Sequence, residues 1–371
     1  MGRSIDKITL NGFKSIQSLE DFELKPLNVL IGANGSGKSN FVSFFPFLHE
    51  MVECRLEKAV NLAGRADSIL FLGPKVTSKI ECRLDFGDNG YRFTLERTTD
   101  GRLIFGDERI VWFGTSGPGY PVNRSIGTGH SESKLKAQIE PENRNKSISE
   151  YIYSAISRWV VYHVHDTSNT AAMRGQCTVR DYESLRPDGG NLAAFLLHLL
   201  EEEKGSYDLI RDTVRLIAPF FDDFLLRPKR QGNDDFVELE WKQNGSDFPF
   251  HPTQLSDGTM RFIALSTALL QPKPPATIVI DEPELGLHPY AISMLADLIK
   301  SASERTQVVV STQSPTLLDY FEPAQIVVVN RVNGKSTFER LDPLTLAAWM
   351  EDYSVGELWQ KNVVQGGPAR E

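Results

Sequence analysis

The chain has 371 residues and a mass of 41.6 kDa, and 40% of its residues are hydrophobic, which suffices for one large α/β domain or two smaller ones. Its net charge of -9 and pI near 5.4 exclude a generally basic surface that coats nucleic acid, although a local basic groove is compatible with this total. The three separated cysteines form no CxxC pair and no apolar run approaches the roughly 18 residues of a membrane span, so we expect a soluble, cytoplasmic protein without a zinc site, a disulfide framework or a membrane partner.

Residues 1–113 are predicted to form a β-rich, nucleotide-binding lobe. Three strands come first, at residues 7–12, 19–24 and 27–31, and a helix follows from residue 38 to about 53. Alternating apolar residues with Gly, Asp and Asn turns then predict an antiparallel meander of strands at residues 80–86, 91–97 and 109–113.

Residues 114–254 are predicted to be an insertion made of a loop and mostly of helices. The stretch from 114 to about 146 is rich in Gly, Ser, Pro, Asn and charge, so we expect an exposed, mobile loop there. Helices are predicted at residues 147–158, 191–203 and 207–218, with one strand at 159–163. No sustained heptads appear, which excludes a long coiled coil.

Residues 255–342 are predicted to alternate helices and strands, which favours a parallel sheet with helices on its faces. The elements are expected at residues 259–270, 276–280, 290–303, 307–311 and 326–330, and residues 343–371 form a helical tail. The chain is therefore predicted to be a single α/β head, with a mixed or parallel core sheet, an antiparallel β lobe and a helical insertion.

Residues 32–39, GANGSGKS, match the phosphate-binding pattern G-x-x-x-x-G-K-[ST] and lie between an apolar strand and a helix, as that loop requires. Glycines let the backbone approach the phosphates of ATP, and the helix N-terminus adds a positive cradle. Lys38 is expected to bridge the β- and γ-phosphates, and Ser39 to bind Mg²⁺. The flanking elements disfavour the alternative, a glycine-rich turn without a ligand. The expected contacts are Gly32, Asn34, Gly35, Ser36, Gly37, Lys38, Ser39 and Asn40.

An apolar strand at residues 277–280 ends in two adjacent carboxylates, Asp281 and Glu282. We expect Asp281 to bind Mg²⁺ and Glu282 to polarise the attacking water. A solvated turn after a strand is the alternative, and the phosphate loop argues against it.

Ser256 and Gly258 precede a predicted helix in the sequence LSDGTMR, and their hydroxyl and amides could bind phosphate as a signature loop. An ordinary helix cap is the alternative. One chain does not usually bring this loop and its own phosphate loop onto one nucleotide. The arrangement therefore implies a homodimer with two ATP molecules between its subunits.

Together with residues 8–15, ITLNGFKS, and 281–289, DEPELGLHP, these motifs resemble the RecF/SMC-like branch of ABC ATPases, and among them small stand-alone predicted ATPases of the AAA_21 type. Residues 162–168, 188–193 and 353–359 extend the resemblance over nearly the whole chain. The resemblance implies an ABC-type P-loop ATPase head that dimerises on ATP. It also implies a role in DNA repair and genome maintenance, or in anti-phage defence beside a separately encoded effector or nuclease.

Two positions depart from the broader pattern of ABC ATPases. Gln313 stands where many relatives have a histidine; its amide can contact a γ-phosphate but cannot relay a proton as imidazole can, so we expect a catalytic role with slow turnover. His288 stands where transporter-type members have an aspartate, and it either contacts the partner subunit or is a surface histidine.

Further candidates have two interpretations each. Lys14, which follows Phe13, either borders the adenine or closes the first strand, and Arg65 either points toward the phosphates or is a solvated loop residue. The glutamine loop of ABC ATPases is not placed, because Gln138 and Gln176 both lie in polar loops.

His163 and His165, with Asp166, imitate a metal site, but a core or loop role is favoured. The densest basic cluster, residues 227–230, is either a contact for double-stranded DNA or a solvated edge. Two other functions stay open: the nucleotide-binding subunit of a membrane transporter, and, because of Gln313, an ATP sensor that does not hydrolyse.

Overall fold

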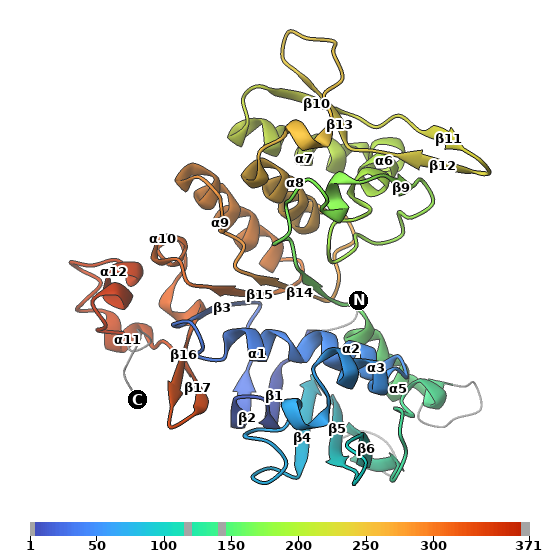
Figure 1. The fold of residues 1–371 in the computed structure, drawn as a ribbon. Coiled ribbons are helices and arrows are strands. Elements are labelled where there is room, and N and C mark those ends of the chain that lie inside the picture. Colours follow the sequence, from blue (N-terminus) through green and yellow to red (C-terminus); the bar gives the residue numbers. More distant parts are fainter. Residues whose placement is uncertain (1–3, 115–120, 140–145, 365–371) are drawn as a thin grey trace.

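The computed structural model describes residues 4–114, 121–139 and 146–364. Figure 1 shows a central sheet with a helical lobe on one side and a β-rich lobe on the other. None of the helices in these ranges combines the length and the apolar character that crossing a membrane requires.

The core sheet has six strands in the order β17-β16-β3-β15-β14-β8. All neighbours are parallel except β17, which pairs antiparallel with β16. Every residue of β3 and β15 is buried, because these near-continuous runs of Val, Ile and Leu are covered on both faces. The predicted mixed α/β core is confirmed. The bounds are β3 Leu27–Ile31, β8 Trp159–Tyr162, β14 Thr277–Asp281, β15 Gln307–Thr312, β16 Ile326–Val332 and β17 Lys335–Arg340.

The β-rich lobe is an antiparallel sheet in the order β2-β1-β4-β5-β6-β7, in agreement with the predicted antiparallel lobe. Alternating buried and exposed residues mark its inner strands. The bounds are β1 Lys7–Phe13, β2 Ile16–Glu23, β4 Lys79–Phe86, β5 Asn89–Arg97, β6 Leu103–Trp112 and β7 Val122–Gly127.

The prediction of a loop from residue 114 to 146 is wrong for its central part. Residues 122–127 form β7, which pairs with β6, and residues 136–139 form the 3-10 helix η1 Lys136–Ile139. β7 is an edge strand without a buried residue, so it carries no apolar alternation for a sequence pattern to detect. Residues 115–120 and 140–145 of the predicted loop lie outside the described ranges.

Helices α1 Lys38–Val42 and α2 Phe44–Val52 lie between the two sheets (Figure 1) and share one hydrophobic core with both. A single helix was expected here, but it is interrupted at Ser43. Pro46 explains the interruption, because its ring clashes with the carbonyl of residue 42 and it has no N–H to donate. Three further helices complete the β-rich lobe: α3 Leu56–Leu62, α4 Ala66–Ile69 and α5 Lys146–Ser157.

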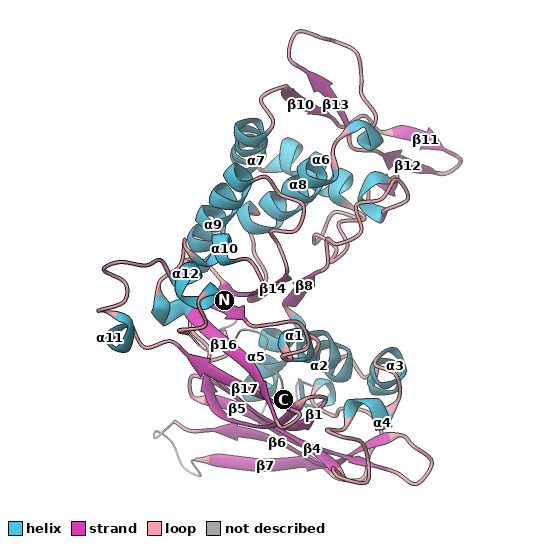
Figure 2. Ribbon diagram, turned by 60° about the vertical axis from the view of Figure 1, so that its left-hand side comes forward, coloured by secondary structure: helices cyan, strands magenta, loops and turns pink. Residues whose placement is uncertain are grey.

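The helical lobe covers the other face of the core sheet and has its own hydrophobic core. Figure 2 shows its helices stacked above β14 and β8 and short strands at its far end. Its helices are α6 Leu192–Glu202, α7 Lys204–Ile217, α8 Asp257–Leu270 and α9 Pro289–Ser303, with 3-10 helices η2 Ala172–Arg174 and η3 Pro252–Gln254.

Residues 114–254 were predicted to be a loop and mostly helices with one strand. They contain α5, α6, α7 and β8 near the predicted positions, and they also contribute β7 and β9 to β13, which were not predicted. The strands of the helical lobe are two to five residues long and largely polar, so they lack a readable period. They are β9 Cys177–Thr178, β10 Phe221–Leu225, β11 Lys229–Gln231, β12 Asp234–Val237 and β13 Glu240–Gln243.

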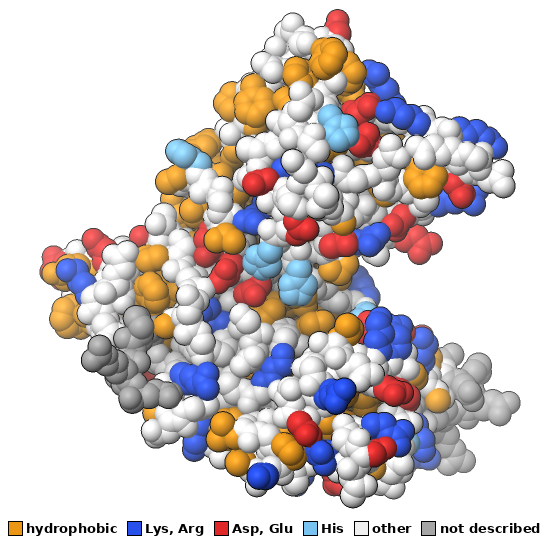
Figure 3. Space-filling view, in the orientation of Figure 1, with side chains coloured by type: hydrophobic (Ala, Val, Ile, Leu, Met, Phe, Trp, Pro, Cys, Tyr) orange, Lys and Arg blue, Asp and Glu red, His pale blue; other side chains and the backbone are white. Residues whose placement is uncertain are grey.

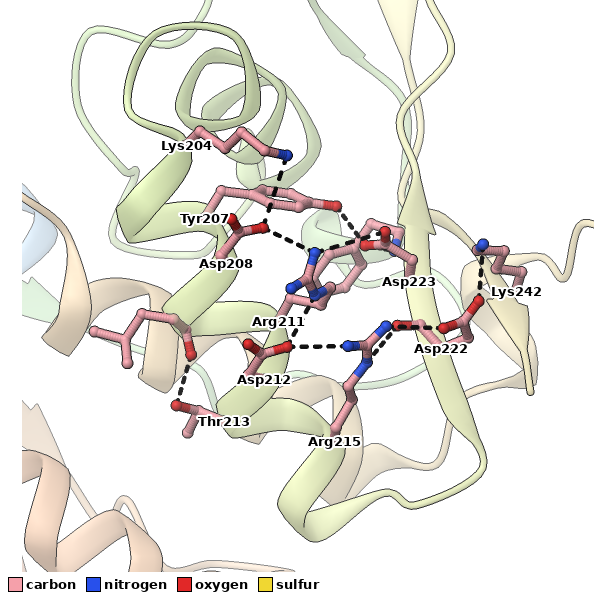
Figure 4. Close-up of polar contacts among 12 residues, drawn as sticks. Lys204, Tyr207, Asp208, Arg211, Asp212, Thr213, Arg215, Asp222, Asp223 and Lys242 are labelled. Atoms are coloured by element: carbon pink, nitrogen blue, oxygen red, sulfur yellow. Dashed lines mark hydrogen bonds and ion pairs between the residues drawn. The ribbon is translucent and has the colours of Figure 1, made fainter.

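A polar network holds the β10–β13 pair against α7 (Figure 4). The hydroxyl of the buried Tyr207 donates to Asp223 at 2.7 Å, and burial with this carboxylate raises the pKa of Tyr207. Arg215 from α7 and Lys242 from β13 both reach Asp222 at 2.8 Å. The short strands are thus fixed by charge as well as by packing.

Short helices form the C-terminal part of the described chain. α10 Pro315–Leu318 packs against α12 Val355–Gln360, where the Gly356 amide donates to Asp319 at 2.8 Å. The 3-10 helix η4 Pro323–Gln325 and α11 Pro343–Leu346 complete the C-terminal region.

Candidate nucleotide-binding site

The phosphate loop joins the carboxyl end of β3 to the N-terminus of α1. Gly35 and Gly37 have φ angles of 77° and 112°, a conformation that favours glycine. A side chain on Gly37 would overlap the Ser336 hydroxyl, and one on Gly32 would overlap the carbonyl of Val329. The loop is therefore shaped by strands β16 and β17, whose contribution the sequence did not indicate.

Lys38 lies at the centre of the loop. Its Nζ donates to the carbonyls of Gly32 at 2.6 Å and Ala33 at 3.2 Å. Burial lowers the pKa of Lys38, and the nearby Glu282, Asp281 and Glu284 oppose this shift. The predicted phosphate-binding lysine and the predicted carboxylates thus lie in one site, because β3, β15 and β14 are parallel neighbours that end at the same edge.

Asp281 is the last residue of β14, and Glu282 follows it with a φ of 45°, a strained conformation for a residue with a side chain. The Glu282 amide donates to the Ser311 carbonyl of β15 at 2.7 Å. The side-chain amide of Gln313, which follows β15, donates to Glu282 Oε1. The structure thus brings Glu282 and Gln313 together.

Glu284 is a half-buried third carboxylate that sequence reasoning missed. Its Oε1 accepts from Thr312 Oγ1 at 2.5 Å and from the backbone N–H of Gln313 at 3.3 Å. Burial raises the pKa of Glu284. Glu284 thereby anchors the segment that carries Gln313. Its position two residues after Glu282 was the available signal.

Four buried side-chain oxygens of this site have no hydrogen-bond partner among the described residues: Ser36 Oγ, Asp281 Oδ1, Glu284 Oε2 and Ser311 Oγ. Unpartnered buried polar atoms are uncommon and point to groups that a ligand satisfies. Mg²⁺ prefers oxygen ligands, and the free carboxylate oxygen of Asp281 is suited to bind this ion. Ser39, the second residue of α1, lies in the phosphate loop and offers a hydroxyl oxygen as a further ligand. Asn34, Gly35 and Ser39 are exposed and open to a phosphate group.

A cavity of about 450 Å³ lies beside α1 and brings Lys14, Ser15 and Asn40 together. Asn40 Nδ2 donates to Ser15 Oγ at 2.7 Å, and Lys14 Nζ donates to Ser43 Oγ at 2.7 Å. Partial burial lowers the pKa of Lys14. With Leu70 and Leu72 in its wall, the cavity offers an apolar surface and polar groups next to the phosphate loop.

The β16–β17 hairpin supports this region from the far end of the sequence. Ser336 Oγ donates a hydrogen bond to the Ser36 carbonyl at 2.6 Å and lies within hydrogen-bond distance of Ser15 Oγ, at 2.7 Å. Arg331 donates to the Gly35 carbonyl at 3.2 Å. Both residues are separated from the phosphate loop by about 300 positions, so no local pattern could identify them.

Arg65 does not lie at the phosphate loop. It precedes α4, has a φ of 75°, and lines a separate polar cavity of about 870 Å³ between α3 and the β5–β6 turn. The structure therefore does not place Arg65 toward the phosphates.

Ser256 caps α8, since its Oγ accepts from the Thr259 amide at 3.1 Å, and it remains exposed. A Cβ on Gly258 would lie 2.6 Å from the Gly286 carbonyl, so the signature loop packs against the loop after Glu282. Among the described residues, no hydrogen bond joins residues 255–258 to the phosphate loop.

Two buried arginines, which sequence reasoning missed, tie this signature loop to its neighbours. Arg174 donates to the carbonyls of Thr167 and Leu255 at 2.9 and 3.1 Å, and to the Asp257 carboxylate at 2.9 Å. Arg261 donates to the carbonyls of Val164 and His165 at 2.9 and 3.0 Å, and to that of Leu285. Single arginines give no sequence signal for such a role.

His163 follows β8 and lies beside Asp281, because Tyr162 pairs with Ile280. Burial lowers the pKa of His163, as does His165, and Asp281 opposes them. Figure 3 shows histidine and acidic side chains gathered at the middle of one face, between the lobes. No three His, Cys, Asp or Glu residues in the described ranges are grouped to hold a metal ion.

The other open candidates lie elsewhere. His288 caps α9, with Nδ1 accepting from the Tyr290 amide at 3.3 Å. Gln176 accepts from Gln231 in the helical lobe, and Gln138 lies in η1, so neither identifies a glutamine loop. Asn191, from the DGGN sequence, is buried and holds the 181–186 loop, with bonds of 2.8 Å to the carbonyls of residues 181 and 184.

Comparison with known proteins agrees with this architecture. None of the curated proteins matches the chain. Among solved structures, it is similar to an Smc head bound to the C-winged helix domain of ScpA, with 18% identity and a TM-score of 0.61 over 94% of this chain and 99% of that one. It is also similar to an Smc head domain with an extended coiled coil, bound to the C-terminal domain of ScpA from Pyrococcus furiosus, with 16% identity and a TM-score of 0.57 over the same shares.

At these identities the likeness concerns the fold, which is that of an SMC-type P-loop ATPase head. Residues 27–319 match the family model AAA_21, described as an AAA domain, putative AbiEii toxin of type IV toxin–antitoxin systems. This range contains the phosphate loop, the signature loop and the Asp281-Glu282 pair. The chain belongs to the AAA_21 family of AAA-domain proteins, and the predicted RecF/SMC-like character of its fold is confirmed.

Proposed function

We propose that the protein binds ATP with Mg²⁺ and hydrolyses it slowly to ADP and phosphate. The observation that carries this proposal is the meeting of Lys38, Asp281, Glu282 and Gln313 at one edge of the core sheet, among buried oxygens without partners. A nucleotide phosphate and its cation would satisfy these groups, and the family assignment supports nucleotide binding.

In this proposal the amides of residues 34–39 and the ammonium of Lys38 bind the phosphates. Ser39 and Asp281 hold Mg²⁺, which when bound neutralises charge on the transferred phosphoryl group. Glu282 orients the attacking water, and Gln313 keeps that carboxylate in place. Lys14 and Asn40 border the base in the cavity beside α1.

We further propose that two copies enclose two nucleotides, with Ser256 and Gly258 of each copy facing the phosphate loop of the other. The signature loop is exposed and makes no hydrogen bond to its own phosphate loop, which is consistent with a role in trans. The Ser256 hydroxyl and the α8 N-terminus would then bind the partner's γ-phosphate.

The test measures steady-state phosphate release and nucleotide binding. Lys38→Ala is expected to lose ATP binding, and Glu282→Gln to keep binding while phosphate release falls about 100-fold or more. Lys273→Ala, whose side chain is 88% exposed, is the matched control and should match the wild type. Wild-type release from the Glu282→Gln protein would contradict the assignment of Glu282. No release from the wild type would favour a non-hydrolysing sensor.

For the cellular role we propose a cytoplasmic ATPase switch, in genome maintenance or in anti-phage defence with a separately encoded effector. The related Smc heads are bound to a domain of ScpA, which supports gating of another protein. Phosphate release should be compared with and without double-stranded DNA. Stimulation would favour genome maintenance, and its absence would favour a switch that acts on a protein.

A further inference from the structure

A cavity of about 410 Å³ lies beside β8, and its lining runs from Arg158, just before the strand, to Tyr162, the last residue of the strand. One wall is the 271–275 segment, which connects α8 to β14. The opposite wall comes from α6 and the loop before it. The cavity is mainly apolar, and its side chains include Val160, Leu185, Phe195 and Leu199.

Two almost fully buried polar side chains, Tyr162 and Gln271, line this cavity, with exposed fractions of 2% and 4%. Gln271 Nε2 donates to the Tyr162 hydroxyl at 3.1 Å and to the Ala268 carbonyl at 2.6 Å. In the described ranges, the Tyr162 hydroxyl has no acceptor for its own hydrogen and Gln271 Oε1 has no donor. The wall therefore presents one free donor beside one free acceptor.

An aromatic pair stands beside these groups. The rings of Tyr182 and His198 stack with centroids 4.5 Å apart and an interplanar angle of 21°, and both residues line the cavity. Tyr182 is 40% exposed, so a flat ring surface is available for stacking with a planar molecule.

The charges around the cavity balance. Arg158 and Lys273 supply two positive groups, and Glu183 and Glu203 supply two negative ones. Lys273 lies 4.0 Å from Glu203. A ligand without net charge fits this lining better than one with several phosphates.

We propose that this cavity binds the imide edge of a uracil- or thymine-type base, as an uncharged nucleoside or as a base of single-stranded nucleic acid. The base carbonyl accepts from the Tyr162 hydroxyl, and the adjacent ring N–H donates to Gln271 Oε1. The apolar walls and the Tyr182–His198 pair cover the faces of the ring. This proposal does not rest on ATP hydrolysis.

The experiment is a calorimetric titration of the full chain with thymidine and with N3-methylthymidine. In N3-methylthymidine a methyl group replaces the hydrogen on the ring nitrogen N3, so this nitrogen can no longer donate. Saturating ADP is kept present so that the phosphate-loop site is filled. A ligand of this size in a well-fitting pocket is expected to bind with a Kd on the order of 0.2 mM. N3-methylthymidine should bind at least about tenfold more weakly, because it cannot donate to Gln271.

Tyr162→Phe removes only the hydroxyl and should weaken thymidine binding about five- to tenfold. Tyr320→Phe, an exposed tyrosine of the C-terminal region, is the matched control and should bind as the wild type does. If a short oligothymidylate binds more tightly than thymidine, the ligand of the cavity is a base of single-stranded nucleic acid. If it binds more weakly, the ligand is the free nucleoside. Equal binding of thymidine and N3-methylthymidine, unchanged binding by Tyr162→Phe, or no binding at 5 mM, roughly 25 times the expected Kd, would overturn the proposal.

Discussion

The side-chain amide of Gln313 donates a hydrogen bond to the carboxylate of Glu282, between the adjacent carboxyl ends of β15 and β14. Glu282 has a φ of 45° and is also held by its own amide, which donates to the Ser311 carbonyl at 2.7 Å. Gln313 therefore holds the carboxylate, at the position that the sequence resemblance predicts to correspond to a histidine in many relatives. It can orient Glu282 but cannot take up a proton.

Gln313→Ala is expected to lower kcat for ATP hydrolysis about 10- to 100-fold with little change in KM, because Glu282 loses the group that positions it. Gln17→Ala, on the exposed side of β2, is the control and should keep the wild-type kcat. Unchanged kcat in Gln313→Ala would show that the hydrogen bond has no catalytic consequence.

Glu284→Gln is expected to raise the free energy of unfolding at pH 8 in the absence of nucleotide and divalent ions. Glutamine can still accept from Thr312 and the Gln313 amide, but it does not bury a charge. Burial raises the pKa of Glu284 above its unfolded value of 4.5. Above the folded pKa, the wild type therefore loses stability because it buries the charged carboxylate. Well below 4.5 the group is protonated in both states, and this loss is absent.

The gain in Glu284→Gln should therefore shrink as the pH is lowered toward 4.5, measured by urea denaturation at several pH values. Exposed Glu20 provides the control, since Glu20→Gln has no burial penalty to relieve. A gain in Glu284→Gln that is independent of pH would contradict this explanation.

The sequence could predict the parts of the site that are local. The phosphate loop and the Asp281-Glu282 pair each consist of consecutive residues at a strand end. The alternation of strands and helices predicted a parallel sheet, in which β14 and β15 are parallel neighbours. The place of β3 beside β15 was not predicted. Glu284, Ser336 and the two buried arginines act through contacts that only the tertiary fold creates. β7 was missed for a related reason, because pairing with β6 rather than apolar periodicity defines it.

Arg174→Met is expected to lower the free energy of unfolding by about 2–4 kcal/mol, because the carbonyls of Thr167 and Leu255 lose the donor that Arg174 provides. Arg180→Met, at an exposed position, should change it by less than about 0.5 kcal/mol. Chemical denaturation measures both. Equal stability of the two variants would show that Arg174 does not hold the signature loop.

Gly258→Ala is expected to weaken ATP-dependent dimer formation, because the added Cβ would lie 2.6 Å from the Gly286 carbonyl and displace the signature loop. Overpacking of this kind costs about 1–3 kcal/mol. Gly205→Ala in α7 is a matched control, since an added Cβ there meets no atom within 4 Å. Dimer formation by Gly258→Ala at the wild-type ATP concentration would contradict the expected displacement.

The most direct measurement is the molar mass of Glu282→Gln by light scattering, with and without saturating Mg²⁺-ATP. A protein that binds ATP without hydrolysing it should accumulate as a dimer of twice 41.6 kDa, while Lys38→Ala and the double variant Glu282→Gln/Ser256→Arg stay at 41.6 kDa. A Glu282→Gln protein that remains at 41.6 kDa with saturating ATP would contradict the ATP-gated dimer.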